Sequence, residues 1–62
     1  MWILKVYKKF EVLPGEYDAK ETYRQYFVDE DANKAQKLAD DLTASYERLG
    51  YADVFSAEAC EA

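Results

Sequence analysis

The chain has 62 residues, one cysteine, no histidine and a formal net charge of −5. That length holds one domain, near the lower limit at which a hydrophobic core is stable without disulfides or a metal ion. The negative charge disfavours nonspecific attraction to nucleic acid or to an anionic membrane, and it favours protein partners with a basic surface. The lone cysteine predicts a reducing, cytoplasmic setting, and the apolar run at residues 1–6 is too short for a signal peptide or a membrane span.

Residues 2–12 alternate as a strand does. One face carries most of the apolar side chains, interrupted only by Lys8: Trp2, Leu4, Val6, Phe10 and Val12. Pro14 and Gly15 then suit the two central positions of a type II turn, and residues 17–20 are typical of a loop. The composition of residues 21–28 predicts a second strand, antiparallel to the first. Its inward residues are either Tyr23 with Phe27 or Tyr26 with Val28, and we favour the first pair.

Residues 29–50 predict the only helix. Their apolar residues recur in steps of three and four and so form one stripe: Ala32, Ala35, Leu38, Ala39, Leu42, Tyr46 and Leu49. Asp29 is expected to cap the first turn with its side chain, and Glu30 and Asp31 add negative charge where the helix dipole is positive. Gly50 suits the left-handed residue that ends a helix.

Residues 51–59 predict a third, weaker strand, with Val54 pointing inward and Phe55 outward. The helix between the second and third strands favours a right-handed crossover, which leaves those strands parallel with the first strand between them. The expected fold is therefore α+β in the order β-β-α-β, a three-stranded antiparallel-type sheet of order 2-1-3 with one helix on one face. We expect one domain over residues 1–62, with a frayed tail at residues 58–62.

Catalytic, metal and cofactor sites are not expected. Adjacent helical residues point about 100° apart, so Asp40 and Asp41 do not converge on one ion, and no histidine assists them. Cys60 lacks a histidine base, and Glu58 and Glu61 flank it with the charge that disfavours a thiolate. The sequence also lacks a Gly-rich phosphate loop and a CxxC pair. We therefore predict that the protein is not an enzyme.

Two surfaces are candidates for binding a partner. The acidic side of the helix offers four carboxylates to a basic protein groove: Asp40, Asp41, Glu47 and Asp53. The sheet face away from the helix is expected to carry Ile3, Tyr7, Tyr26 and Phe55, as a homodimer seam or, less favoured, a platform for single-stranded RNA. Each surface has a plainer interpretation, a solvated helix face and aromatic side chains that shield the sheet without a partner.

Small, acidic, cysteine-poor chains of this kind resemble inhibitors encoded by phages or mobile elements, anti-CRISPR proteins among them. The resemblance is one of size and charge, and it carries no functional residue. It implies a protein-binding module that occupies the basic groove of a nucleic-acid-handling protein. The alternative is an assembly module that forms homodimers through the open sheet face.

Overall fold

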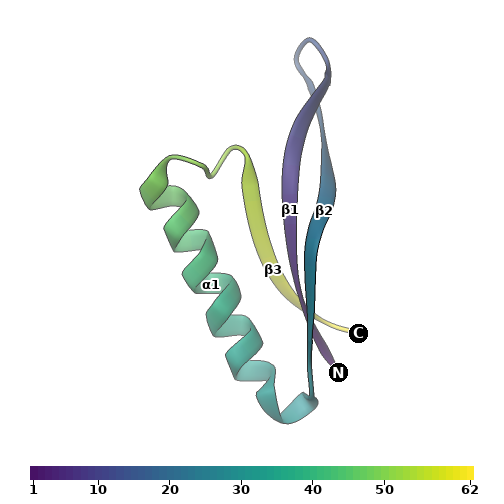
Figure 1. Cartoon of the computed structure of the whole chain (residues 1–62), viewed down its shortest axis with the longest axis vertical. Helices are drawn as coiled ribbons and strands as arrows, with labels where there is room; N and C mark the ends of the chain where they lie inside the picture. The colour runs from purple at the N-terminus through teal and green to yellow at the C-terminus, as the bar shows by residue number, and fades with distance from the viewer.

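The computed structural model describes all 62 residues in the order β1 (Trp2–Leu13), β2 (Glu16–Phe27), a 3-10 turn η1 (Asp29–Asp31), α1 (Ala32–Leu49) and β3 (Phe55–Glu61). The strands form one sheet in the order β2-β1-β3, and β1 is antiparallel to both neighbours. α1 contacts β1 and β3 (Figure 1). The predicted α+β fold and its strand order 2-1-3 are confirmed. α1 lacks the apolar length that crossing a membrane requires.

The core between α1 and the sheet is small. Its buried residues come from the first half of each element: Leu4 and Val6 of β1, and Ala35 and Ala39 of α1. Leu4 is 1% exposed and is the largest side chain that is fully buried. Leu38 and Leu42 are half-buried, whereas Leu49 at the end of the predicted stripe is 62% exposed. The helix therefore packs against the sheet through alanines, with its leucines at the margin.

The pairing of β1 with β2 decides which side chains of β2 face the helix. Trp2 lies opposite Phe27 and Val6 lies opposite Tyr23. Directly opposed residues of a sheet point to the same face, so Tyr23 and Phe27 share the helix side with Leu4. The favoured inward pair of the second strand is confirmed.

The hairpin is longer than predicted. β2 begins at Glu16 and not at residue 21, so residues 17–20, expected to be a loop, are paired with β1. The turn at Pro14 and Gly15 is tight, with Gly15 at a φ of 81°. Once such a turn fixes the register, backbone N–H and C=O groups pair on both sides of it whatever the side chains are.

The distal part of the hairpin extends past α1 and β3 (Figure 1). β1 has 12 residues and α1 has 18, lengths of about 40 Å and about 27 Å at the usual rise per residue. The ladder between β1 and β3 ends, on the side of the hairpin turn, at the pair of Lys8 and Phe55. Residues 8–20, here called the hairpin arm, are all exposed. The radius of gyration is accordingly 12.8 Å, against about 10.6 Å for a compact domain of this length.

The two ends of the helix differ in how well the sequence predicted them. The side chain of Asp29 makes no cap hydrogen bond, contrary to the prediction, because its carboxylate forms an ion pair with the Met1 amino group. The α-helix instead begins one turn later, at Ala32. At the other end Gly50 is left-handed, with a φ of 80°, and its N–H donates to the Glu47 carbonyl at 3.2 Å. This C-cap is confirmed.

Phe55 faces the helix, and its prediction as an outward residue is wrong. Its ring centroid lies 5.5 Å from that of Tyr46 and 6.1 Å from that of Tyr51. The ladder with β1 places Ala57 opposite Val6 on the helix side, and Phe55, two residues earlier on the same strand, shares that side. Phe55 is therefore absent from the open sheet face.

The strand β3 occupies a later stretch than predicted. Val54 precedes it, and the Val54 carbonyl accepts a hydrogen bond from the Lys9 N–H at 2.7 Å. Residues 58–61, predicted to fray, belong to β3, and the Ala62 N–H donates to the Met1 carbonyl at 2.9 Å. The C-terminal residues thus complete the ladder beside the N-terminus.

Candidate functional site

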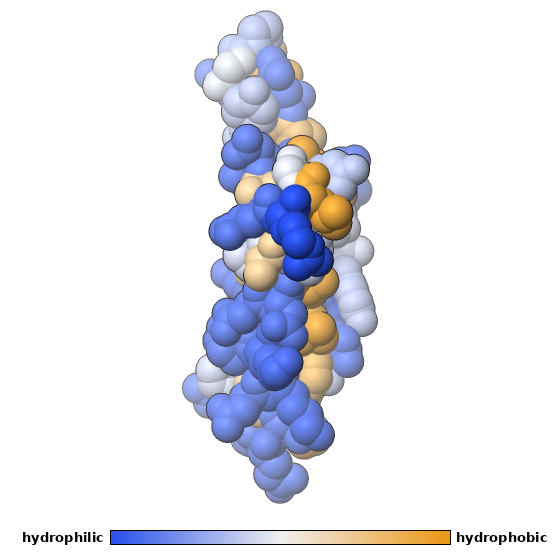
Figure 2. Space-filling view, turned by 90° about the vertical axis from the view of Figure 1, so that its left-hand side faces the viewer, coloured by the Kyte–Doolittle hydropathy of each residue, from blue (hydrophilic) through white to orange (hydrophobic).

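The outer surface of α1 carries three of the four carboxylates in the predicted acidic site. Asp40 and Glu47 are seven residues apart, close to two full turns, so they lie on one line along the helix, about 10.5 Å apart in axial rise. Asp41 lies about 100° around the axis from Asp40. All three side chains are exposed. Figure 2 shows hydrophilic surface over the helix, with apolar side chains along one edge.

The neighbours of these carboxylates differ in charge. The Lys37 ammonium lies 3.1 Å from the Asp41 carboxylate, a pairing of residues four apart on one helix. Asp40 accepts a hydrogen bond from the neutral Gln36 amide at 3.0 Å. Glu47 forms no ion pair. Asp40 and Glu47 therefore form no ion pair, although Lys37 lies three residues before Asp40 and Arg48 directly follows Glu47.

Asp53 lies apart from the helical carboxylates. It follows Gly50 in the connection to β3 and lines a pocket of about 390 Å³ together with Lys9 and Tyr17 of the hairpin. Asp53 thus shares this pocket with the charged side chain of Lys9, a residue of the hairpin arm. The predicted acidic site is divided between the outer face of α1 and this pocket.

The open sheet face carries the other three predicted residues. The register aligns Tyr26 of β2, Ile3 of β1 and Cys60 of β3 on one rung. Ile3 is 7% exposed although no helix covers it, whereas Tyr26 is 55% exposed. Tyr7 is half-buried further along the same face. These three aromatic and aliphatic side chains share one face as predicted, without Phe55.

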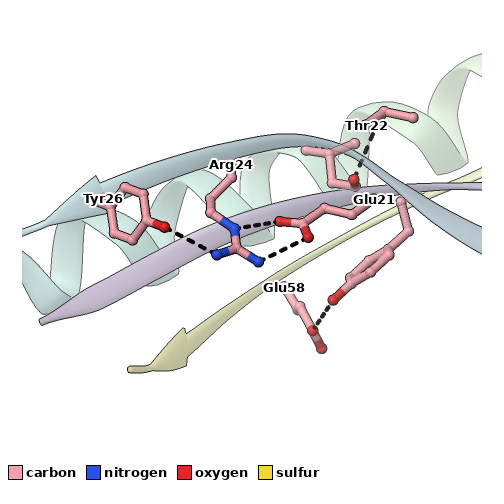
Figure 3. A network of polar contacts seen from close by, with 7 residues as sticks. Glu21, Thr22, Arg24, Tyr26 and Glu58 are labelled. Atoms are coloured by element: carbon pink, nitrogen blue, oxygen red, sulfur yellow. Dashed lines mark hydrogen bonds and ion pairs between the residues drawn. The ribbon is translucent and has the colours of Figure 1, made fainter.

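Charged side chains join the residues of this face in a polar network (Figure 3). The Arg24 guanidinium donates to both carboxylate oxygens of Glu21, at 2.6 and 2.9 Å, and to the Tyr26 hydroxyl at 3.0 Å. The Tyr7 hydroxyl donates to the Glu58 carboxylate at 3.1 Å. Partial burial, and then the hydrogen bond and charge of Glu58, raise the pKa of Tyr7. On this polar face Glu21 and Arg24 form an ion pair, whereas Lys5 forms none and Glu58 bonds to the neutral Tyr7 hydroxyl.

A β-bulge creates the Glu21–Arg24 pair, which the sequence analysis did not find. Residues three apart on a regular strand point to opposite faces. Thr22 has no partner on β1, because Val6 pairs with Tyr23 and the next residue of β1 pairs with Glu21. This extra residue brings Glu21 onto the face that Arg24 occupies. Nothing in the residue types marks the bulge, so the spacing gave no signal.

The pair predicts a small dependence of stability on acid. The hydrogen bonds from Arg24 lower the pKa of Glu21 below its ordinary value of 4.5. A carboxyl whose pKa is lower in the folded state stabilises the fold above its unfolded pKa, and that contribution is lost as the pH falls through the folded pKa. Glu21→Gln should therefore lower the melting temperature slightly at pH 7 and leave it unchanged at about pH 3.

Thermal unfolding followed by circular dichroism at the two pH values measures this difference. Glu30→Gln is the control, because Glu30 is exposed and forms no ion pair. An equal loss of melting temperature for Glu21→Gln at both pH values would contradict the assignment.

No group of three His, Cys, Asp or Glu side chains lies close enough together to hold a metal ion. Cys60 is a free, half-buried thiol. No family model, no curated protein and no solved structure matches the chain.

Proposed function

We propose that the protein is a non-catalytic protein-binding module that presents the outer face of α1 to a basic partner. The observation that carries this proposal is the pair Asp40 and Glu47, two exposed carboxylates on one line of the helix, neither of which forms an ion pair. Asp41 and Asp53 extend the negative surface to the side and past the helix end. In this proposal all four engage the partner.

The partner that fits this surface is a Lys- and Arg-rich groove of a nucleic-acid-handling protein. Asp40 and Glu47 offer exposed negative charge to the Lys and Arg side chains that otherwise contact phosphates. Opposite fields also accelerate docking and make it sensitive to salt.

The biological role that follows is that of an inhibitor encoded by a phage or a mobile element, of the anti-CRISPR or another anti-defence type. A rigid helix fixed to a sheet presents its charges without first having to order a disordered segment. The small size of the chain, 62 residues, and its charge of −5 suit a competitor for a nucleic acid site.

The experiment is inhibition of nucleic acid cleavage by purified RNA-guided effector nucleases, measured with the native chain and with Asp40→Lys combined with Glu47→Lys. We expect the double variant to lose inhibition by at least about tenfold, with a melting temperature close to that of the native chain, because both side chains are exposed. Raising the salt concentration should weaken the native chain in the same way.

The matched control is Glu30→Lys combined with Glu61→Lys, which changes the net charge equally at exposed positions outside the outer face of α1. If the control and the double variant lose inhibition equally, inhibition depends on the net charge of the chain and not on the outer face of α1. Full inhibition by the Asp40 and Glu47 variant would reject the proposed surface.

The open sheet face supports a second candidate function, homodimeric assembly. Tyr26 is 55% exposed beside the Arg24 guanidinium, and Tyr and Arg are the residue types that dominate interface energetics. The same face is the only candidate for the weaker alternative of single-stranded RNA binding, for which Lys5 and Arg24 would supply the positive charge. The negative charges of Glu21, paired with Arg24, and of Glu58, which forms no ion pair, lie beside these aromatics and weigh against RNA.

A further inference from the structure

The hairpin arm carries an uncompensated like-charge pair at its base. Lys8 of β1 lies directly opposite Lys20 of β2, on the helix side of the sheet, two residues beyond the buried Val6. Like charges at opposed positions destabilise a strand pair. Neither lysine takes part in any of the ion pairs of the molecule. The fold therefore leaves two adjacent positive charges without an ion-pair partner.

The same face of the arm is apolar beyond these lysines. Phe10 continues the line of Leu4 and Val6 but lies past the end of α1, and it is 41% exposed; Val12, at a second irregularity of the β1–β2 register, is 52% exposed. A two-stranded ribbon on its own is at best marginally stable in water. β1 is about 13 Å longer than α1, so the helix cannot cover the whole of the strand's core face.

Charge on the arm is polarised along its length. The base carries Lys8 and Lys20, whereas Asp18 lies opposite Phe10 and Glu16 lies next to the turn. With Lys9 and Glu11 the arm holds three basic and three acidic residues and is neutral, although the whole chain has a charge of −5. The arm is therefore a part of the molecule where two copies can meet without the repulsion between their net charges.

We propose that this surface binds a second copy of the chain, with the two arms packed face to face about a two-fold axis. Antiparallel packing places the acidic tip of each arm over the lysine pair at the base of the other, so Asp18 and Glu16 of one copy meet Lys20 and Lys8 of its partner. Phe10 of both copies forms the apolar centre.

The thickness of the layers agrees with this arrangement. Face-to-face sheets pack about 10 Å apart, similar to the distance between packed helices of about 8–10 Å. The partner arm therefore fills the layer that α1 vacates at its C-terminal end. The arm has 13 residues, of which only those on one face enter the interface; this is fewer than the roughly 20–30 per side of a standard interface, so the dimer is expected to be weak, with a dissociation constant in the micromolar range.

Sedimentation velocity over a concentration series from about one micromolar to about one millimolar tests the proposal, because that range spans the expected dissociation constant. We expect the native chain to pass from monomer to dimer. Lys20→Glu and Asp18→Lys should each weaken the dimer about tenfold, because each places two like-charge contacts across the two-fold axis. Lys34→Glu, an equal charge change on α1, should leave it unchanged.

Mixing the two variants gives the decisive measurement. A Lys20→Glu copy and an Asp18→Lys copy are complementary in both halves of the interface, so the mixture should dimerise as the native chain does although neither variant does so alone. Both side chains are exposed, and circular dichroism confirms that each variant is folded. A native chain that stays monomeric throughout would overturn the proposal. So would a mixture that fails to dimerise, or a dimer lost in Tyr7→Lys and retained in Lys20→Glu, which would place the contact on the open sheet face.

Discussion

Replacing Leu4 with alanine should lower the free energy of unfolding by about 2–5 kcal/mol, the range for removing a large aliphatic side chain from a core. Leu4 is the only large side chain that is fully buried, at 1% exposure, and the other residues of the α1-facing core are Val6 and two alanines. A domain of this size rarely has more than about 3–5 kcal/mol in total. The loss is therefore comparable with the whole stability, and the unfolded fraction at 25 °C should rise measurably.

Urea unfolding of both chains, followed by circular dichroism, measures the effect. Leu49→Ala is the matched control, since it removes the same atoms from a side chain that is 62% exposed, and it should change the free energy by less than about 0.5 kcal/mol. A loss of less than 1 kcal/mol for Leu4→Ala, on the order of a single surface contact, would show that α1 does not pack on β1 as described.

The parts of the fold that follow from chain-wide patterns were predictable. The helical stripe is long, and Gly50 marks its end by a conformation that other residues adopt at a cost. The strand order follows from the handedness of the connection through α1, which does not depend on any single side chain. The central position of β1 follows from its apolar composition in the same way.

The parts that depend on backbone pairing were not predictable from residue types. β2 starts at Glu16 because the turn fixes the register, although residues 17–20 have the composition of a loop. Phe55 faces α1 because Ala57 pairs with Val6, a choice made by the ladder and not by the short third strand itself. The bulge at Thr22 places Glu21 beside Arg24 against the ordinary alternation.

In the candidate site, too, local helical geometry was predictable and contacts between distant segments were not. Helical geometry places Asp40 and Glu47 on one line of α1, and it also predicts that a lysine four residues before Asp41 can pair with it, as Lys37 does. The position of Asp53 beside Lys9 depends on how the connection after Gly50 meets the hairpin. That contact joins residues far apart in the chain, so no local pattern indicates it.

Replacing Ala35 with leucine should lower the free energy of unfolding by about 1–3 kcal/mol. The small core makes the opposite result plausible, because a leucine adds apolar area that is worth about 25 cal/mol for each Å² buried. Ala35 is 0% exposed, however, and α1 packs against the sheet through Ala35 and Ala39. A longer side chain there must push the helix away from the sheet, and the separation would expose Leu4.

Ala44→Leu separates the two effects, because Ala44 lies on the exposed side of the same helix and gains the same atoms without a packing cost. Its free energy of unfolding should stay within about 0.5 kcal/mol of the native value. If Ala35→Leu instead stabilises the chain in urea unfolding, the space between α1 and β1 is larger than the burial of Ala35 indicates. The shortage of apolar area would then limit stability more than the closeness of the helix does.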